Sequence, residues 1–216
     1  MIRDPLVSII ITNYNYERYI KDAINSALNQ TYPNVEVIVV DDGSIDDSKK
    51  IILQFGKTII GIFKENNGQT SAINTGFTNC TGTYIIFLDS DDILLPTALE
   101  KAVGCFVDPQ VVKVHWAMLK IDDEGIRTGT IVPAAPLADG DYLTELIKQG
   151  PNHSGGPEYS PPSSGIVWSR KYLENVFPLP ENKFKNGCSD YLLSSLAPVF
   201  GTIRSLPEPY GCYRVH

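Results

Sequence analysis

The stretch YIIFLDSDDILLP, residues 84–96, runs from a continuous apolar segment directly into three aspartates, Asp89, Asp91 and Asp92. A short apolar run rich in β-branched and aromatic residues predicts a strand that is buried on both faces. If strand geometry persists to Asp91, Asp89 and Asp91 point to the same side, with Cα atoms about 6.6 Å apart from two rises of about 3.3 Å. Asp92 then faces elsewhere. Like charges this close either stay hydrated or recruit a cation.

The acidic cluster taken alone has two interpretations. In the first it is a solvated turn that caps the helix after Pro96. In the second it binds a hard divalent cation, because oxygen ligands favour Mg²⁺ or Mn²⁺ over zinc. Mg²⁺ commonly uses one or two carboxylates and takes its remaining ligands from water and a substrate diphosphate. The position of the cluster relative to the other strand ends bears on this choice.

Upstream of this stretch, short apolar runs alternate with segments of helical periodicity. Strands are predicted at 6–12, 35–40, 58–63 and 82–88, and helices at 17–28, 45–55 and 68–80. Four strands that alternate with three helices imply right-handed crossovers and a mainly parallel sheet with both faces covered. The fold class predicted from these runs is α/β.

Ligands bind at the carboxyl ends of strands in such sheets, and three polar segments fall there: TNYN (12–15), DDGS (41–44) and DSDD (89–92). In the first, Thr12 and Tyr14 offer a hydroxyl and a ring face to a nucleotide, although a structural turn explains this segment about as well. In the second, one aspartate starts the next helix and the other accepts hydrogen bonds from a base edge or a ribose hydroxyl. Convergence of the three segments on one sheet edge favours the cation-binding interpretation.

The pattern changes downstream of Pro96. We expect a helix at 97–106, an antiparallel hairpin of 111–121 and 126–132 that joins the sheet, a strand at 165–169, helices at 169–176 and 189–200, and an extended end at 209–216. Residues 150–165 are rich in Gly, Pro and Ser and predict a long, flexible loop of the kind that often acts as a lid or a binding loop. We predict one domain over 1–216, with a nucleotide-binding half at 1–95 and an acceptor-binding half at 96–216.

Composition and charge exclude several classes of protein. With 43% hydrophobic and 20% charged residues, the chain has the composition of a soluble globular protein. The net charge of −7 argues against sequence-independent binding of nucleic acid. The four cysteines form no CxxC pair, so no zinc site is expected. No apolar run approaches the roughly 18 residues of a membrane span, which makes a cytoplasmic protein the default expectation.

These motifs together resemble glycosyltransferase family 2, a large family of inverting enzymes in the nucleotide-diphospho-sugar transferase superfamily. The resemblance runs in order through VSIIITNYN, SALNQTYPNVEVIVVDDGSIDDS, NNGQTSAINTGF and GTYIIFLDSDDILLP, which cover nearly all of residues 5–100. The later segments CSDYLL and YGCYRVH fit more loosely. The resemblance implies the GT-A fold, with a Rossmann-like, mostly parallel central sheet, helices on both faces, and a smaller antiparallel region on the acceptor side.

The resemblance also implies roles for particular residues. The nucleotide-binding positions would be Thr12, Tyr14, Asp42 and Ser90. Asp89 and Asp91 would form the DxD pair, with Asp91 preferred as the direct ligand of the Mn²⁺ or Mg²⁺ ion that bridges the diphosphate. His216, in a terminal YRxH motif beside Arg214, would be a further ligand to the metal or to the diphosphate.

The reaction that the resemblance implies is a single displacement at the anomeric carbon of the donor sugar. A general base is expected about 100 residues downstream of the DxD pair, which maps to Asp190. The donor would be a nucleotide-diphospho-sugar, by expectation a UDP-sugar, and the acceptor a glycan or a lipid-linked molecule. The expected setting is polysaccharide biosynthesis for the cell envelope, in the cytoplasm or at the inner face of the membrane.

Departures from the family pattern keep other interpretations open. Ser189 precedes Asp190 where the family usually shows Glu, so a capping role at a helix N-terminus remains the alternative for Asp190. Ile73 stands where relatives commonly carry Arg. A nucleotide-sugar binding module without catalysis is therefore an alternative. A sugar nucleotidyltransferase is another, although TNYNYERY is not the Gly-rich, basic phosphate loop that such enzymes carry.

Overall fold

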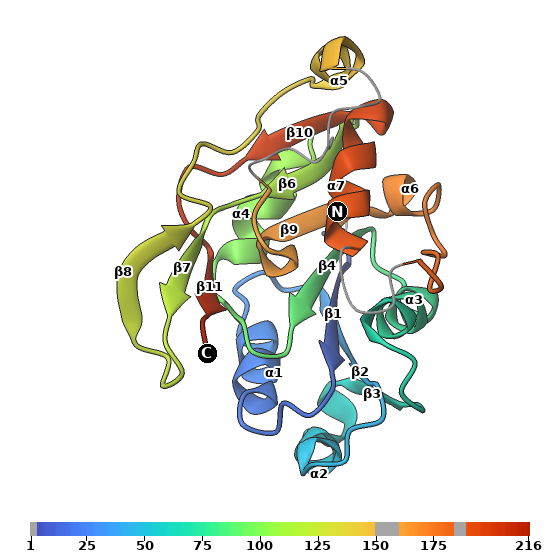
Figure 1. Ribbon diagram of the computed structural model, residues 1–216, viewed down its shortest axis with the longest axis vertical. Helices are drawn as coiled ribbons and strands as arrows, with labels where there is room; N and C mark the ends of the chain where they lie inside the picture. The colour runs from blue at the N-terminus through green and yellow to red at the C-terminus, as the bar shows by residue number, and fades with distance from the viewer. Residues whose placement is uncertain (1–3, 150–159, 184–188) are drawn as a thin grey trace.

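The computed structural model describes residues 4–149, 160–183 and 189–216 of the chain. A seven-stranded sheet forms the centre of the fold, with helices on both faces and a four-stranded sheet at one side (Figure 1). The central sheet runs in the order β10 (Thr202–Ser205), β6 (Val111–His115), β9 (Ile166–Ser169), β4 (Tyr84–Asp89), β1 (Val7–Asn13), β2 (Val35–Asp41) and β3 (Ile60–Phe63).

Parallel pairing dominates the central sheet. β1 pairs in parallel with β2 and β4, β2 with β3, and β10 with β6. Only β9 runs against its neighbours, β4 and β6, within the described sheet. The predicted mostly parallel α/β sheet is therefore confirmed.

Two apolar cores, one on each face, explain why the strands are continuous apolar runs. Alternate residues of β1 enter different cores, with Ile9 and Ile11 on one face and Ile10 on the other. The first core is completed by α1 (Ile20–Leu28), α2 (Ser48–Gln54) and α4 (Ala98–Cys105), and the second by α3 (Gln69–Asn79), α6 (Arg170–Leu173) and α7 (Ser189–Phe200). A strand covered on both faces has no polar side and shows no alternation.

The remaining helices are short. They are α5 (Leu143–Gln149) and the 3₁₀ turns η1 (Gly56–Thr58) and η2 (Ser163–Gly165). Of the predicted loop at 150–165, residues 150–159 lie outside the described residues, and the last three residues form η2. No helix in the described parts of the chain has both the length and the apolar character to cross a membrane.

The smaller sheet corrects one prediction. Its order is β5 (Ile93–Leu94), β11 (Gly211–Arg214), β7 (Met118–Ile121) and β8 (Arg127–Val132), with antiparallel β7–β8 and β5–β11 pairs and a parallel β7–β11 pair. The predicted hairpin was expected to join the central sheet, but only 111–115 does so, as β6. The neighbouring positions on both sides of β6 are taken by β9 and β10, so the chain turns away at Trp116, whose amide donates to the Gly165 carbonyl (3.0 Å).

The three polar segments meet at one edge of the central sheet, as predicted. Asn13 at the end of β1 is level with Asp41 at the end of β2, and Thr12 is level with Asp89 at the end of β4. Parallel strands in this register bring all three following loops to the same place.

Close approach of α3 to the sheet generates a test of this packing. A Cβ atom on Gly76 would overlap Ile10 Cγ2, whereas one on Gly104 in α4 would meet nothing within 4 Å. We expect Gly76→Ala to lower the free energy of unfolding by about 1–3 kcal/mol, because overpacking displaces β1. The matched Gly104→Ala should raise it by up to about 1 kcal/mol. Urea denaturation of both variants checks this, and a shift of the same sign in both would contradict it.

Candidate functional site

A cavity of about 740 Å³ opens at the carboxyl edge of the central sheet. Six of the predicted site residues line it together: Thr12, Tyr14, Asp42, Asp89, Ser90 and Asp91. Gly68 and Gln69, at the start of α3, line it as well. Two smaller cavities in the described structure, of about 450 and 360 Å³, contain none of these residues.

The first polar segment divides into structural and available side chains. Asn13 is buried, and its Nδ2 donates to Asp41 Oδ2 (2.8 Å) and to Ser44 Oγ (3.1 Å). These bonds join the loop after β1 to the loop after β2. Asn13 lines the cavity together with Thr12 and Tyr14, and the Tyr14 side chain is exposed. The turn interpretation thus holds for Asn13, while Thr12 and Tyr14 remain accessible to a ligand.

Neither aspartate of the second segment starts the next helix, which corrects that prediction. Asp41 accepts a bond from the Ser44 amide (2.9 Å) and so closes the turn. The helix, α2, begins later, at Ser48, whose amide donates to Asp46 Oδ1 (3.0 Å). The hydrogen bond from the Ser44 amide to Asp41 closes the DDGS turn. The helix α2 starts only after this turn.

Asp42 is buried and accepts hydrogen bonds from three donors. It accepts hydrogen bonds from Lys64 Nζ (2.6 Å), the Gly68 amide (2.7 Å) and the Asn67 amide (3.2 Å). Lys64 thereby compensates its charge, and the loop that precedes α3 is fixed with Gly68 at a φ of 93°. Asp42 therefore has a structural role beside the cavity that the sequence did not reveal, and its contact with a nucleotide stays a prediction.

The acidic segment leaves strand geometry after Asp89. β4 ends at Asp89, and the Asp92 amide donates to the Asp89 carbonyl (3.2 Å), so the chain turns at Ser90 and Asp91. The condition that strand geometry persists to Asp91 is not met, because this turn closes directly after the last paired residue.

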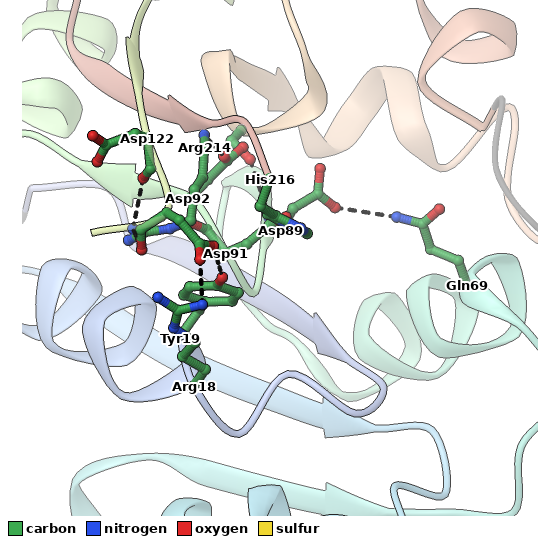
Figure 2. A network of polar contacts seen from close by, with 11 residues as sticks. Arg18, Tyr19, Gln69, Asp89, Asp91, Asp92, Asp122, Arg214 and His216 are labelled. Atoms are coloured by element: carbon green, nitrogen blue, oxygen red, sulfur yellow. Dashed lines mark hydrogen bonds and ion pairs between the residues drawn. The ribbon is translucent and has the colours of Figure 1, made fainter. Parts of the chain in front are cut away.

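The two carboxylates of the predicted DxD pair have different partners. Asp89 accepts from Gln69 Nε2 (3.1 Å) and from Ser163 Oγ (2.9 Å). Asp91 Oδ2 lies 3.0 Å from His216 Nε2. Figure 2 shows Asp89 facing Gln69, with Asp91 and His216 on the other side. Neither Gln69 nor Ser163 was predicted to belong to the site. The signal for Gln69 was its place in the NNGQ motif at a helix start, and no spacing pointed to Ser163.

Crowding of negative charge dominates the electrostatics of this edge. Burial, followed by repulsion from Asp91, raises the pKa of Asp89 to about 6. Burial, followed by repulsion from Asp89 and Asp91, raises the pKa of Asp92 well above its usual range. Carboxylates in this state gain stability from any nearby cation.

His216 is brought to the acidic segment from the far end of the sequence. Its ring stacks on Tyr19 with 5.3 Å between centroids and meets Tyr16 edge-on at 5.7 Å. In the described parts of the chain no three His, Cys, Asp or Glu side chains are arranged to hold a metal ion by themselves. A carboxylate-rich edge with Asp91 beside His216 nevertheless fits a Mn²⁺ or Mg²⁺ ion that takes its other ligands from water and a diphosphate.

Asp190 lies outside the cavity lining, in the first turn of α7. Its Oδ1 accepts from the adjacent Tyr191 amide (2.8 Å). It is close enough to Asp89 to contribute to the raised pKa of that carboxyl. The structure therefore places Asp190 near the acidic segment, and its role as a base stays a prediction.

A buried lysine behind Asp190 was missed. Lys113 in β6 is fully buried, its Nζ donates to Ser160 Oγ and Ser194 Oγ (both 3.0 Å), and it lies 5.4 Å from the Trp168 ring centroid. Burial lowers its pKa to about 7, against an opposing attraction from Asp190. The available signal was a single charge within the apolar run VVKVHWAM.

Comparison with known proteins identifies the family of this chain. Residues 8–159 match the family model of glycosyl transferase family 2. The chain is 36% identical over 217 residues to an uncharacterized glycosyltransferase of Nostoc sp., an alignment that covers 97% of this chain and 65% of that protein. It is 47% identical over 125 residues to an uncharacterized glycosyltransferase of Rickettsia prowazekii, covering 57% and 39%. The chain thus spans less than two thirds of the length of these relatives.

Solved structures share the fold at low sequence identity. Residues 1–349 of S. aureus TarS, in complex with UDP, superpose with a TM-score of 0.72 at 22% identity, over 97% of this chain and 60% of that one. Mannosyltransferase PcManGT from Pyrobaculum calidifontis, in complex with GDP-Man and Mn²⁺, gives 0.71 at 19%, over 98% and 57%. This likeness confirms the predicted GT-A fold.

Crowding at the acidic edge predicts that removing one charge stabilises the ligand-free protein. Asp89→Asn should raise the free energy of unfolding by about 1–2 kcal/mol at pH 7.5. This is less than the free energy that corresponds to the whole pKa shift, because Asp89 keeps contact with solvent in the cavity. The folded pKa is raised, so the gain should fade as the pH falls from 6 toward 4, where wild-type Asp89 becomes protonated. Urea denaturation at pH 7.5 and 4.5 measures it. Asp46→Asn, which weakens amide bonds at the start of α2, should lose stability instead.

Burial of Lys113 predicts that its contribution to protein stability changes with pH in the opposite direction to that of Asp89. Its lowered folded pKa means that the unfolded chain binds more protons between pH 7 and about 10, so wild-type stability gains from this group as the pH rises. Lys113→Met should therefore be more stable than wild type at pH 6, by about 1–4 kcal/mol, and the difference should shrink by pH 9.5. Ser160 and Ser194, 3.0 Å apart, can bond to each other in the variant. A difference independent of pH would contradict a buried, proton-labile lysine.

Proposed function

This chain belongs to glycosyl transferase family 2, and on that premise we propose that it is an inverting glycosyltransferase. It moves a sugar from a nucleotide-diphospho-sugar, by preference a UDP-sugar, to a hydroxyl group of a glycan or lipid-linked acceptor. The observation that carries the proposal is the single cavity of about 740 Å³ in which polar segments from three adjacent strand ends converge. Cavities of roughly 300–1,000 Å³ suit ligands of this size.

The nucleotide is assigned to the Thr12 side of the cavity. The exposed Tyr14 ring offers a stacking face to the base, and Thr12 and Ser90 offer hydroxyl groups. Asp42, already bonded to Lys64, can accept a further hydrogen bond because each carboxylate oxygen has two lone pairs. The bound UDP of TarS and GDP-Man of PcManGT support a nucleoside diphosphate as the ligand.

The absence of basic side chains among the described residues that line the cavity supports a metal requirement. None of the described residues that line it is Lys, Arg or His. Ile73, where relatives commonly carry Arg, is buried in the core on the α3 side. A diphosphate beside Asp89 and Asp91 therefore needs a cation that these side chains do not supply. Asp91 and Asp89, with His216, would hold Mn²⁺ or Mg²⁺, which when bound stabilises the charge that develops on the leaving diphosphate.

Asp190 is assigned as the general base. The acceptor oxygen attacks the anomeric carbon, the bond between that carbon and the diphosphate oxygen breaks, and the hydroxyl proton passes to the Asp190 carboxylate. Attack on the face opposite the leaving group inverts the anomeric configuration. The electrostatic influence of Asp190 on Asp89 supports its position at this edge. For a lipid-linked acceptor, as in synthesis of cell-envelope polysaccharide, the reaction takes place at the inner face of the membrane.

A second candidate function is a nucleotide-sugar binding module without catalysis. Ser189 in place of the family's usual Glu before Asp190 favours it. The two functions share the donor cavity and differ in turnover. A sugar nucleotidyltransferase differs from both, because it would release pyrophosphate from a nucleoside triphosphate.

Donor binding and turnover test the proposal. With UDP-, GDP- and dTDP-sugars and Mn²⁺, we expect one nucleotide series to stabilise the protein, by about 2.7 kcal/mol at 100 times its Kd. Asp91→Asn should lose the Mn²⁺-dependent part of this stabilisation. Asp190→Asn should keep binding but lose about 10²–10⁴-fold in turnover. Asp108→Asn, an exposed residue before β6, serves as the matched control.

Three outcomes separate the candidates. Donor hydrolysis or transfer that survives both EDTA and Asp91→Asn would overturn the metal-dependent mechanism. Donor binding without turnover over a broad set of acceptors favours the binding module. Pyrophosphate release from a nucleoside triphosphate favours the nucleotidyltransferase.

A further inference from the structure

Arg214 in β11 lies directly against the acidic segment and is almost fully buried. Its backbone amide donates to Asp92 Oδ1 (3.0 Å), and its Nε donates to the backbone carbonyl of Asp91 (2.9 Å). One residue thus holds two consecutive positions of the 89–92 segment, through two different kinds of bond. It contributes no atom to the lining of the donor cavity.

The other end of the guanidinium reaches a separate part of the chain. Nη1 donates to the carbonyl oxygens of Asp122 (3.2 Å) and Asp123 (3.0 Å), in the turn between β7 and β8. The guanidinium carbon lies 4.6 Å from the centroid of the Tyr19 ring in front of α1. Figure 2 shows the guanidinium between the acidic segment and Asp122, with Tyr19 beside it.

Asp123 anchors this turn on the far side. Its carboxylate accepts hydrogen bonds from Arg18 and from the Tyr19 hydroxyl. The β7–β8 turn is therefore fixed to the start of α1, and Arg214 bonds to the carbonyls of a turn that is itself immobilised. The chain of contacts runs from Arg18 and Tyr19 through Asp123 to Arg214 and then to Asp91.

The chemistry of arginine suits this arrangement. A guanidinium is planar, keeps its charge, and presents donors in a fixed fork, so it can bond to carbonyls on two sides at once. A lysine ammonium is a point charge without that fork. Fixing the Asp91 carbonyl restricts the peptide that carries the Asp91 side chain. His216, two residues beyond Arg214, is held by the same strand end and lies 3.0 Å from Asp91.

We propose that Arg214 is the positioning residue of the metal site, with Asp123 as its anchor. Arg214 acts through Asp91 and His216, which it holds at the separation that a shared divalent ion requires, and it contacts neither the donor nor the ion. This inference rests on the proposed function. Mutation of residues that orient metal ligands in this way typically lowers metal affinity about 10–100-fold.

Mn²⁺ affinity in the presence of saturating UDP, measured from the EPR signal of free Mn²⁺, tests the proposal. Arg214→Gln should weaken Mn²⁺ binding about 10–100-fold, and Arg214→Lys should do so less. At saturating Mn²⁺, kcat of the Lys variant should stay within about threefold of wild type, because the groups that touch the substrate are unchanged. Glu124→Gln is the matched control on the same turn, since its exposed carboxylate pairs with Arg18 at the surface (3.6 Å), and this variant should bind Mn²⁺ as wild type does.

A folded Arg214→Gln variant with Mn²⁺ affinity within twofold of wild type would overturn the proposal. If circular dichroism shows that this variant is unfolded, Arg214→Lys and Asp123→Asn decide. Asp123→Asn keeps Arg214 but weakens its anchor, and it should lose about 3–10-fold in Mn²⁺ affinity, at the low end of what orienting residues contribute. Wild-type affinity in both would refute the positioning role.

Amide hydrogen exchange separates this inference from the proposed function. In the metal-free protein, Arg214→Lys should speed exchange in segment 89–94, where the Asp92 amide bonds to the Asp89 carbonyl (3.2 Å), and leave β2 unchanged. A wild-type protein that binds no Mn²⁺ with UDP would count against the proposed metal site, whereas the exchange result would still report on positioning. Unchanged exchange in segment 89–94 would overturn the positioning role whatever the metal result.

Discussion

Repulsion among carboxylates at the end of β4 is the constraint that organises this protein. Asp89 ends a strand covered on both faces, and Asp91 and Asp92 follow it. Burial together with mutual repulsion raises the pKa values of Asp89 and Asp92. The fold places neutral hydrogen-bond donors beside Asp89, the imidazole of His216 beside Asp91 and the backbone amide of Arg214 beside Asp92. These contacts organise the segment without neutralising it. The charge that remains supports the proposal that a divalent ion and a diphosphate bind in the cavity.

In the polar loops at this edge, some side chains hold the backbone and others are available to a ligand. Asn13 and Asp41 bond to each other, and Asp42 bonds to Lys64 and to the loop before α3. With the loops held in this way, Thr12 and Tyr14 can face the cavity without supporting the backbone. A preorganised loop loses less conformational freedom when it binds a ligand. The position of the start of α3, with Gly68 and Gln69 at the cavity, depends on the same bonds.

The second sheet gives the acidic segment its other support. β11 brings Arg214 and His216 back from the end of the sequence, and the β7–β8 turn supplies the carbonyls that hold the guanidinium. Asp190, the proposed general base, lies in the first turn of α7. Lys113 is buried, and its ammonium group contacts the hydroxyl groups of Ser160 and Ser194 and the ring of Trp168.

Local pattern was enough to determine the parallel core and the edge at which the site forms. Continuous apolar runs can be buried only between two helical layers, and the polar segments that follow β1, β2 and β4 then meet at one edge. The pattern failed where distant neighbours decide the structure. β6 has both flanks filled, so the segments after it enter a second sheet. The pattern also left open whether strand geometry persists beyond Asp89, where the chain turns. The short elements α5 and β10 were missed. The pairing of Arg214 with Asp91, of Lys113 with Ser194, and of Asp42 with Lys64 joins residues far apart in the sequence, and periodicity carries no information about such contacts. Tertiary packing alone decides them, because a buried charge is stable only where the fold brings it a partner.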